Sequence, residues 1–202
     1  ELSQRNPRLV YCSVSAYGHT GPDSARPGFG LIAEAKCGAM AQIGVPGEPP
    51  PLFRMPIADM YTGIHGVAAV CAALLGRAKS GKGQHIDMAM LDVALILMSS
   101  HLAGYLRNGV HPKPGGNSNP HATNSAYQTR YGLVMLGASN LRQQRRLWTL
   151  LERPDMIKTT NEQREIDRER EAAVLSEIML ARTADEWEVF LQSRHVPAAR
   201  VR

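Results

Sequence analysis

The chain has 202 residues, enough for one large domain or two modest ones, and 20% of them are charged, as is ordinary for a globular protein. The net charge of +5 suits an anionic ligand, but no basic stripe with interleaved aromatic residues is present, which argues against nucleic acid as a partner. The longest apolar stretches, such as residues 67–75, are too short to span a bilayer, so no membrane partner is expected.

The cysteine and histidine residues give no sign of a metal centre. Cys12, Cys37 and Cys71 lie far apart in apolar or small-residue stretches, without the paired spacing of a metal site. We therefore expect buried free thiols in a reducing, cytoplasmic setting. The seven histidines lack ligand spacing as well, so no metal cofactor is predicted. The chain starts with neither an initiator Met nor an apolar leader, so no signal peptide is expected.

The first half of the chain predicts alternating strands and helices, and thus an α/β fold. Two short apolar runs, residues 9–14 and 84–90, are typical of buried strands. Between them, residues 29–40 predict a broken helix, and residues 62–78 predict the clearest helix, because apolar side chains recur there every three or four positions. A further helix is expected over residues 91–107, apolar on nearly all sides and therefore buried in a domain or subunit interface.

A polar stretch rich in Gly and Pro, residues 111–120, predicts a domain boundary. The part of a large α/β domain that carries the candidate catalytic aspartate is expected to cover residues 1–108. A linker loop and a small α+β domain are expected to cover residues 109–202.

The second half predicts a hairpin, several helices and a final strand. The hairpin strands are expected at residues 126–128 and 133–136, and the last strand at residues 196–201. A long helix over residues 161–181 carries charges of alternating sign, which is typical of a solvated helix face. The last helix is expected to begin at Thr183, with Glu186 three residues later as its capping-box partner.

Asp59 is the carboxylate with the strongest case for chemistry, since it directly precedes the helix predicted at residues 62–78. One interpretation is structural: Asp is a favoured N-cap, whose carboxylate accepts hydrogen bonds from first-turn N–H groups. The other interpretation is functional. The helix dipole favours the charged form of such a carboxylate, which can then attack a thioester and form an anhydride. The two interpretations do not exclude each other.

Gly115, Gly116 and Asn117 form a second candidate feature. Two glycines and an asparagine in a loop can fold over a ligand as a lid. A flexible connection between domains fits the same composition, so composition alone leaves both interpretations open. No dinucleotide-binding glycine fingerprint, Walker sequence or serine nucleophile elbow is present.

Motifs spread along nearly the whole chain carry a resemblance to a known family. They are NPRLVY at 6–11, SAYGHTGP at 15–22, RPGF at 26–29, IADMYTG at 57–63, GKGQHID at 81–87, GN at 116–117, RPD at 153–155 and VP at 196–197. Each motif is weak alone. Their order and spacing together resemble the class III coenzyme A transferases, the CaiB/BaiF type that includes formyl-CoA transferase.

The resemblance implies that Asp59 is the nucleophile of a CoA transferase. Asp59 would attack a donor acyl-CoA to give a mixed anhydride, and CoA would then form an aspartyl thioester that an acceptor carboxylic acid resolves. The substrates implied are acyl-CoA, the source of coenzyme A, and a carboxylic acid. The implied fold is part of a Rossmann-like large domain plus a smaller α+β domain, in an interlocked homodimer of chains nearly twice this length.

The resemblance also suggests binding residues. Gly115, Gly116 and Asn117 match the family's glycine-rich lid, which shields the covalent intermediates from water. Tyr17 and Arg26 lie in motifs near the active site and are candidates for contacts to CoA or to the acyl carboxylate. Much of the CoA nucleotide is expected on a preceding Rossmann-like portion.

Departures from the family pattern keep two alternatives in view. The related α-methylacyl-CoA racemases use a histidine and an aspartate at the positions occupied here by Phe29 and Gly30, so the racemase base is missing. Gly30 also departs from many transferases, which keep an acidic residue there, and His19 stands where Gln is usual. A racemase-like isomerase is therefore the weaker enzymatic alternative, and a non-catalytic fragment or binding protein is the other.

Overall fold

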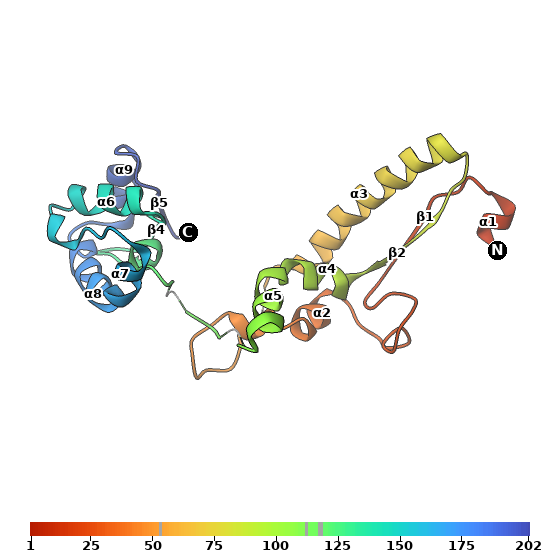
Figure 1. Ribbon diagram of the computed structural model, residues 1–202, viewed down its shortest axis with the longest axis horizontal. Helices are drawn as coiled ribbons and strands as arrows, with labels where there is room; N and C mark the ends of the chain where they lie inside the picture. Colours follow the sequence, from red (N-terminus) through yellow and green to blue (C-terminus); the bar gives the residue numbers. More distant parts are fainter. Residues whose placement is uncertain (53, 112, 117–118) are drawn as a thin grey trace. The chain divides into compact units, whose positions relative to one another are not determined.

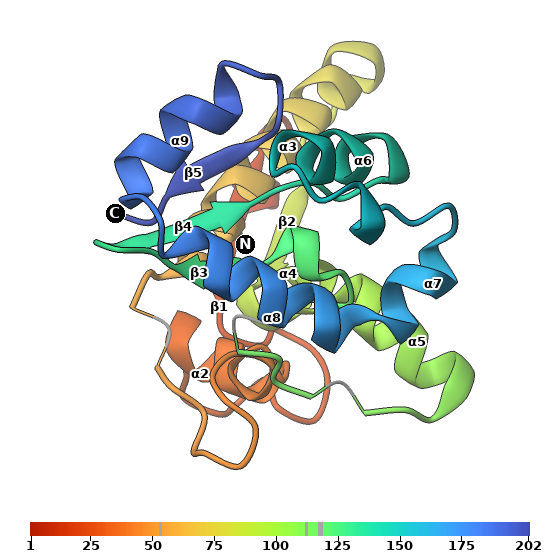
Figure 2. The same cartoon turned by 90° about the vertical axis from the view of Figure 1, so that its left-hand side faces the viewer.

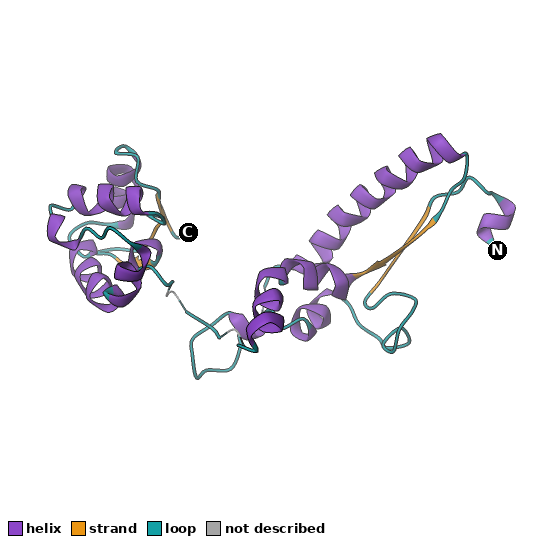
Figure 3. Ribbon diagram, viewed as in Figure 1, coloured by secondary structure: helices purple, strands orange, loops and turns teal. Residues whose placement is uncertain are grey.

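The computed structural model describes residues 1–52, 54–111, 113–116 and 119–202. The chain forms two compact units, Glu1–Gly116 and Asn117–Arg202 (Figure 1). The first contains two strands and the longest helix, and the second contains a small sheet with four α-helices (Figure 3).

Unit 1 is built on a β–α–β arrangement. Strands β1 (Tyr11–Ser15) and β2 (His85–Ala89) pair in parallel, and their bounds match the two strands predicted from the sequence to within two residues at each end. Parallel neighbours need a crossover, and helix α3 (Ile57–Ser80) supplies it. Gly81 ends α3 in the left-handed conformation, with φ of 73°, so the chain can turn back into β2 (Figure 1).

The remaining elements of unit 1 are short. They are α1 (Leu2–Arg5), α2 (Gly30–Lys36), a 3₁₀ turn (Met40–Gln42), α4 (Met90–Leu97) and α5 (Ser99–Asn108). The prediction of one continuous helix over residues 91–107 is wrong, because the chain breaks at Met98, and burial of this segment in a domain or subunit interface stays a prediction. The break falls before a pair of serines, a residue type that competes with helical hydrogen bonding.

Three alanines form the small core that joins α2, α3 and α4. Ala33, Ala58 and Ala94 come from one helix each, and none is more than 2% exposed. A methyl group is the smallest side chain with a Cβ, so these contacts let the three helices approach closely. The N-terminus of α3 is thereby fixed against α2 and α4.

Most of the apolar surface of α3 is exposed within unit 1. Ile64, Val67 and Leu75 are each more than 60% exposed, and only Ala58, Thr62 and Ala73 are buried. With 24 residues, α3 is long and apolar enough to cross a membrane by length and composition alone. The expectation that no segment reaches that length is therefore wrong, because the sequence pattern placed the start of this helix five residues too late.

Unit 2 is an antiparallel sheet covered by helices (Figure 2). The strands β3 (Ala126–Gln128), β4 (Leu133–Leu136) and β5 (Ala198–Arg200) lie in that order, which confirms the predicted hairpin and final strand. The helices are α6 (Leu141–Leu150), α7 (Asn161–Ile166), α8 (Arg168–Met179) and α9 (Ala184–Gln192), with 3₁₀ turns at Ala122–Asn124 and Pro154–Met156. The capping box of Thr183 and Glu186 at the start of α9 is also confirmed.

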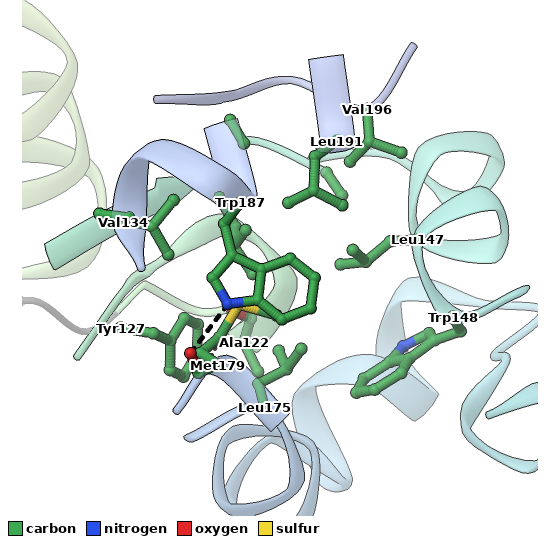
Figure 4. Close-up of a cluster of buried hydrophobic side chains, with 14 of the residues drawn as sticks. Ala122, Tyr127, Val134, Leu147, Trp148, Leu175, Met179, Trp187, Leu191 and Val196 are labelled. Carbon is green, nitrogen blue, oxygen red and sulfur yellow. Dashed lines mark hydrogen bonds between the residues drawn. The ribbon is translucent and has the colours of Figure 1, made fainter. Parts of the chain in front are cut away.

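Large side chains fill the core of unit 2. Figure 4 shows the ring of Trp187 among Leu147, Leu175 and Leu191, all of them buried. The indole N–H of Trp187 donates a hydrogen bond to the carbonyl oxygen of Met179 at 2.8 Å. The donor of this ring is therefore satisfied although the ring is buried.

The charged segment of unit 2 departs from its prediction. The single helix expected over residues 161–181 is divided at Asp167 into α7 and α8, and its face is not uniformly solvated. Arg164 and Glu171 are both completely buried. The Arg164 guanidinium donates to Thr123 Oγ1 at 2.9 Å and to the backbone carbonyls of Ala138 and Ser139, which explains how a charged group is accommodated there.

Candidate active site

Asp59 lies in the first turn of α3 with an exposed side chain. The helix begins at Ile57 with Pro56 as its N-cap, so the prediction that Asp59 precedes the helix as its cap is wrong. Within the part of the chain that the structure describes, no hydrogen bond or ion pair involves the Asp59 carboxylate. The side chain is therefore accessible and is not committed to a structural contact.

Glu34 performs the capping role instead. Its Oε1 atom accepts a hydrogen bond from the backbone N–H of Ala58 at 2.9 Å, and its side chain is only 3% exposed. The first-turn N–H that needs a partner is thus satisfied from α2, 24 residues earlier in the chain. Because Glu34 occupies this position, the carboxylate of Asp59 is left for other chemistry.

Gly30, the first residue of α2, lies directly against Asp59. A Cβ atom built on Gly30 would come within 1.7 Å of Asp59 Oδ2 and 2.4 Å of Asp59 Cγ. Those distances are far below any real contact, so the carboxylate occupies the space that a side chain at residue 30 would need. Helix α2 therefore meets the start of α3 at two points one turn apart, Gly30 and Glu34.

A group of charged side chains around Asp23 links Tyr17 with Arg26. The Lys36 ammonium lies 4.7 Å from the centre of the Tyr17 ring and also bonds Asp23. Arg26 pairs with Asp23 at 3.0 Å and remains largely exposed. The hydrogen bond from Lys36, together with the nearby Arg26 charge, holds the pKa of Asp23 below its usual range.

The stretch Gly28–Gly30 connects this group with Asp59. A Cβ on Gly28 would lie 2.9 Å from the Tyr17 hydroxyl oxygen, while Gly30 lies against the Asp59 carboxylate. Tyr17 and Asp59 thus pack against Gly28 and Gly30, which lie two positions apart in the chain. No direct contact of Tyr17 or Arg26 with Asp59 is found among the described residues.

The glycine-rich loop is only partly described. Gly115 and Gly116 are exposed, and the N–H of Gly116 donates to the carbonyl oxygen of Gly44 at 2.8 Å. Asn117 lies outside the described residues. The described hydrogen bond ties the loop to residue 44 rather than to Asp59, so a lid role stays a prediction.

A cavity of about 380 Å³ lies beside the start of α3. Its wall includes Ala58 and Met60, the two sequence neighbours of Asp59, together with Met55, Cys37 and Met98. Its volume lies within the range typical of small-molecule sites. Burial raises the pKa of the Cys37 thiol, which suits an inert wall residue.

The cysteines differ from the expectation in one respect. No disulfide joins them, but Cys71 is exposed on α3 and Cys12 and Cys37 are only half-buried. The expected burial of all three is wrong, because α3 leaves most of its surface uncovered within unit 1. Among the residues that the structure describes, no group of three or more His, Cys, Asp or Glu side chains is arranged to hold a metal ion.

A histidine pair joins the two strands of unit 1, a feature that sequence spacing does not reveal. Ser13 Oγ lies 2.9 Å from His19 Nε2 and 2.7 Å from His85 Nε2. The backbone N–H of His19 donates to Asp87 Oδ2 at 2.8 Å, which fixes the loop after β1. The parallel register pairs Ser13 with Asp87, and the side chain of His85, two positions earlier on β2, reaches Ser13 Oγ from 72 positions away in the chain.

Comparison with known proteins identifies the family. CoA-transferase family III matches the whole chain, residues 1–202, and the chain belongs to this family. The succinate–glutarate CoA-transferase of Agrobacterium fabrum is 38% identical over 149 residues, covering 72% of this chain and 37% of that protein. The human succinyl-CoA:glutarate CoA-transferase is 28% identical over 202 residues, covering 98% of this chain and 46% of that protein.

Solved structures agree in fold. A CaiB/BaiF family protein from Brucella suis is 33% identical, with a TM-score of 0.83 over 100% of this chain and 55% of that one. A Mycobacterium tuberculosis protein, named a probable fatty acyl-CoA transferase, gives a TM-score of 0.85 at 29% identity, over 100% of this chain and 54% of its own. The chain thus spans about half the length of the relatives it matches, and its predicted fold class is confirmed.

Proposed function

We propose that the protein to which this chain belongs transfers CoA from an acyl-CoA donor to a carboxylic acid, with Asp59 as the nucleophile. The observation that carries the proposal is the state of the Asp59 carboxylate. It is exposed in the first turn of α3 and has no polar partner among the described residues, while Glu34 satisfies the neighbouring N–H. Membership of CoA-transferase family III and the names of the relatives support the same reaction.

The proposed reaction runs through covalent intermediates on Asp59. A carboxylate oxygen of Asp59 attacks the donor thioester carbonyl, the C–S bond breaks, and a mixed anhydride and CoA thiolate result. The thiolate attacks the aspartyl carbonyl, which releases the donor acid and leaves an aspartyl-CoA thioester. The acceptor carboxylate displaces CoA to give a second anhydride. The thiolate then attacks the acceptor acyl carbon, which releases the new acyl-CoA and restores the Asp59 carboxylate.

Other residues have supporting roles in this proposal. Tyr17, Arg26 and the glycine loop Gly115–Gly116, with Asn117, are proposed to contact CoA or to shield the intermediates from water. Lys36, which sequence patterns did not single out, adds a positive charge beside Tyr17 and is a further candidate for contact with an anionic group. A homodimer of the intact protein is part of the proposal.

The acids are proposed by class only. Relatives are named for succinate or succinyl-CoA with glutarate, malate or citramalate, and one is named for acetyl-CoA with oxalate, which makes short dicarboxylic acids the first group to assay. A racemase-like isomerisation is less well supported, because Phe29 and Gly30 cannot act as an acid–base pair. Deuterium uptake at the α-carbon of an acyl-CoA, without any acceptor acid, would favour that alternative.

The test uses the intact protein and three variants. Asp59→Ala and Asp59→Asn are expected to lower the rate of CoA transfer by at least about 1,000-fold, since no other group takes over the covalent step. Hydroxylamine added during turnover should trap a hydroxamate at residue 59 in the wild type but in neither Asp59 variant. Asp185→Ala is the matched control, because Asp185 also lies in the first turn of a helix, α9. Near-normal turnover by Asp59→Ala would exclude the proposed nucleophile.

A further inference from the structure

Three contacts fix Ala58, the residue that directly precedes Asp59. Its N–H donates to Oε1 of Glu34 at 2.9 Å, and the Glu34 side chain is only 3% exposed. Its carbonyl oxygen accepts from Thr62 Oγ1 at 2.6 Å. Its methyl group is completely buried in the small core between α2, α3 and α4. Ala58 is therefore held through its N–H, its carbonyl oxygen and its side chain.

The bond from Glu34 is the polar contact that ties this turn to another helix. Thr62 belongs to α3 itself, and Pro56, the N-cap of α3, makes no side-chain hydrogen bond. Within the described part of the chain, Glu34 is the one side chain that accepts from a first-turn N–H of α3. First-turn N–H groups have no partner within the helix, and helix ends fray when those groups lack an acceptor.

We propose that Glu34 is a positioning residue, which holds the first turn of α3 and thereby the Asp59 carboxylate in the orientation that reacts. The inference rests on the proposed role of Asp59 as nucleophile. It goes further by assigning the orientation of that nucleophile to a hydrogen bond from α2. Glu34 touches no reacting atom in this proposal, because its Oε1 atom is engaged by the N–H of Ala58.

Loss of this bond affects the backbone that carries the nucleophile. The Cα atom of Asp59 lies in the first turn of α3, so fraying of that turn moves the whole side chain. The carboxylate takes part in each proposed covalent step, first as nucleophile and then as the acyl group under attack. A misplacement of about 1 Å in such a group can cost about 100-fold in rate. Substrate binding depends on other contacts and is expected to change little.

Two uncharged substitutions of Glu34 in the intact protein separate the hydrogen bond from the charge. Gln and Met are both long and neutral, but only Gln ends in an oxygen that accepts well from the N–H of Ala58. Glu34→Met is expected to lower kcat by at least about tenfold, with KM for the acyl-CoA donor within about twofold of the wild type. Glu34→Gln is expected to keep kcat within about threefold, because the acceptor is restored.

Glu188→Met is the matched control in unit 2. Glu188 Oε2 accepts from the backbone N–H of Arg200 at 3.1 Å, so this variant loses the same kind of bond. All rates are measured well below the lowest melting temperature of the set. Glu188→Met is expected to keep the wild-type kcat and KM even where its melting temperature falls. The same pattern in Glu34→Met, or an equal loss of kcat in Glu34→Met and Glu34→Gln, would overturn the proposal.

A second measurement covers failure to fold and failure of the proposed function. If Glu34→Met does not fold, Glu34→Ala takes its place, because it also lacks the acceptor but adds no bulk. Should the wild type transfer no CoA, the proposed function fails, whereas hydrogen–deuterium exchange still tests the contact. The amides of residues 57–60 should exchange faster in the variant without an acceptor than in Glu34→Gln. Equal exchange in the two variants would overturn the positioning role.

Discussion

The two units of this chain bury side chains of very different size. Unit 2 encloses two tryptophans and several leucines around a three-stranded sheet, whereas the small core of unit 1 consists of Ala33, Ala58 and Ala94. Large buried side chains supply most of the free energy of folding in small domains. Alanines supply little, but they allow helices to approach closely. Unit 2 therefore has a self-sufficient core, while unit 1 uses close helix contacts to place one carboxylate.

The same substitution in both units tests this contrast. Leu147→Ala in unit 2 removes a completely buried side chain and is expected to lower the free energy of unfolding by about 2–5 kcal/mol. Leu75→Ala on α3 alters a side chain that is 68% exposed, so we expect a change of no more than about 0.5 kcal/mol. Urea denaturation of the 202-residue chain measures both. Equal losses of unfolding free energy in the two variants would contradict the proposed difference between the two cores.

Burial of the Glu171 carboxylate makes the stability of unit 2 depend on pH. Burial raises the pKa of Glu171 from 4.5 to about 7, and neither carboxylate oxygen has a hydrogen-bond partner among the described residues. The folded state therefore binds this proton more tightly than the unfolded state, so the stabilisation is complete below pH 4.5 and is lost as the pH rises through about 7.

Glu171→Gln should remove that dependence, because the amide carries no charge at any of these pH values. At pH 8 the variant is expected to be more stable than the wild type by roughly 1–3 kcal/mol, since one pKa unit corresponds to about 1.4 kcal/mol. Thermal unfolding between pH 4 and pH 8 measures the difference, which should disappear near pH 4. A variant less stable than the wild type at pH 8 would show that the charged carboxylate is well accommodated.

In unit 1, two substitutions of Glu34 test its role as the cap of α3. Glu34→Ala leaves the buried N–H of Ala58 without its acceptor and is expected to cost about 1–2 kcal/mol. Glu34→Gln keeps an oxygen acceptor and should cost less. Hydrogen exchange at the Ala58 amide is the direct measurement, with faster exchange in the Ala variant only. Equal exchange in both variants and the wild type would mean that the bond contributes little.

Local signals in the sequence were enough for much of the fold. The separate strands β1 and β2, the hairpin of β3 and β4 and the capping box at Thr183 follow from apolar runs and from residues three positions apart. Family motifs pointed to Asp59 in the same way. The structure shows where that residue lies, and the proposed experiments test its chemistry.

Features that depend on distant residues were not predictable from local patterns. The cap of α3 comes from Glu34 on another helix, and the space beside Asp59 comes from Gly30. Arg164 looked like a surface residue, because Thr123, Ala138 and Ser139, three of the residues that accept hydrogen bonds from its guanidinium, lie more than 20 positions away. Pairing of this kind arises only when the chain is folded.

The packing of Ala33, Ala58 and Ala94 sets the distance between α2 and the first turn of α3, which carries Asp59. A larger side chain at residue 33, 58 or 94 would widen the gap between helices and carry Asp59 off Gly30. Ala58 and Ala94 also line the neighbouring cavity, whereas Met55, Met60 and Met98 in its wall lie outside this alanine core. Changes at these methionines can therefore alter the shape of the cavity while the distance between α2 and α3 stays constant.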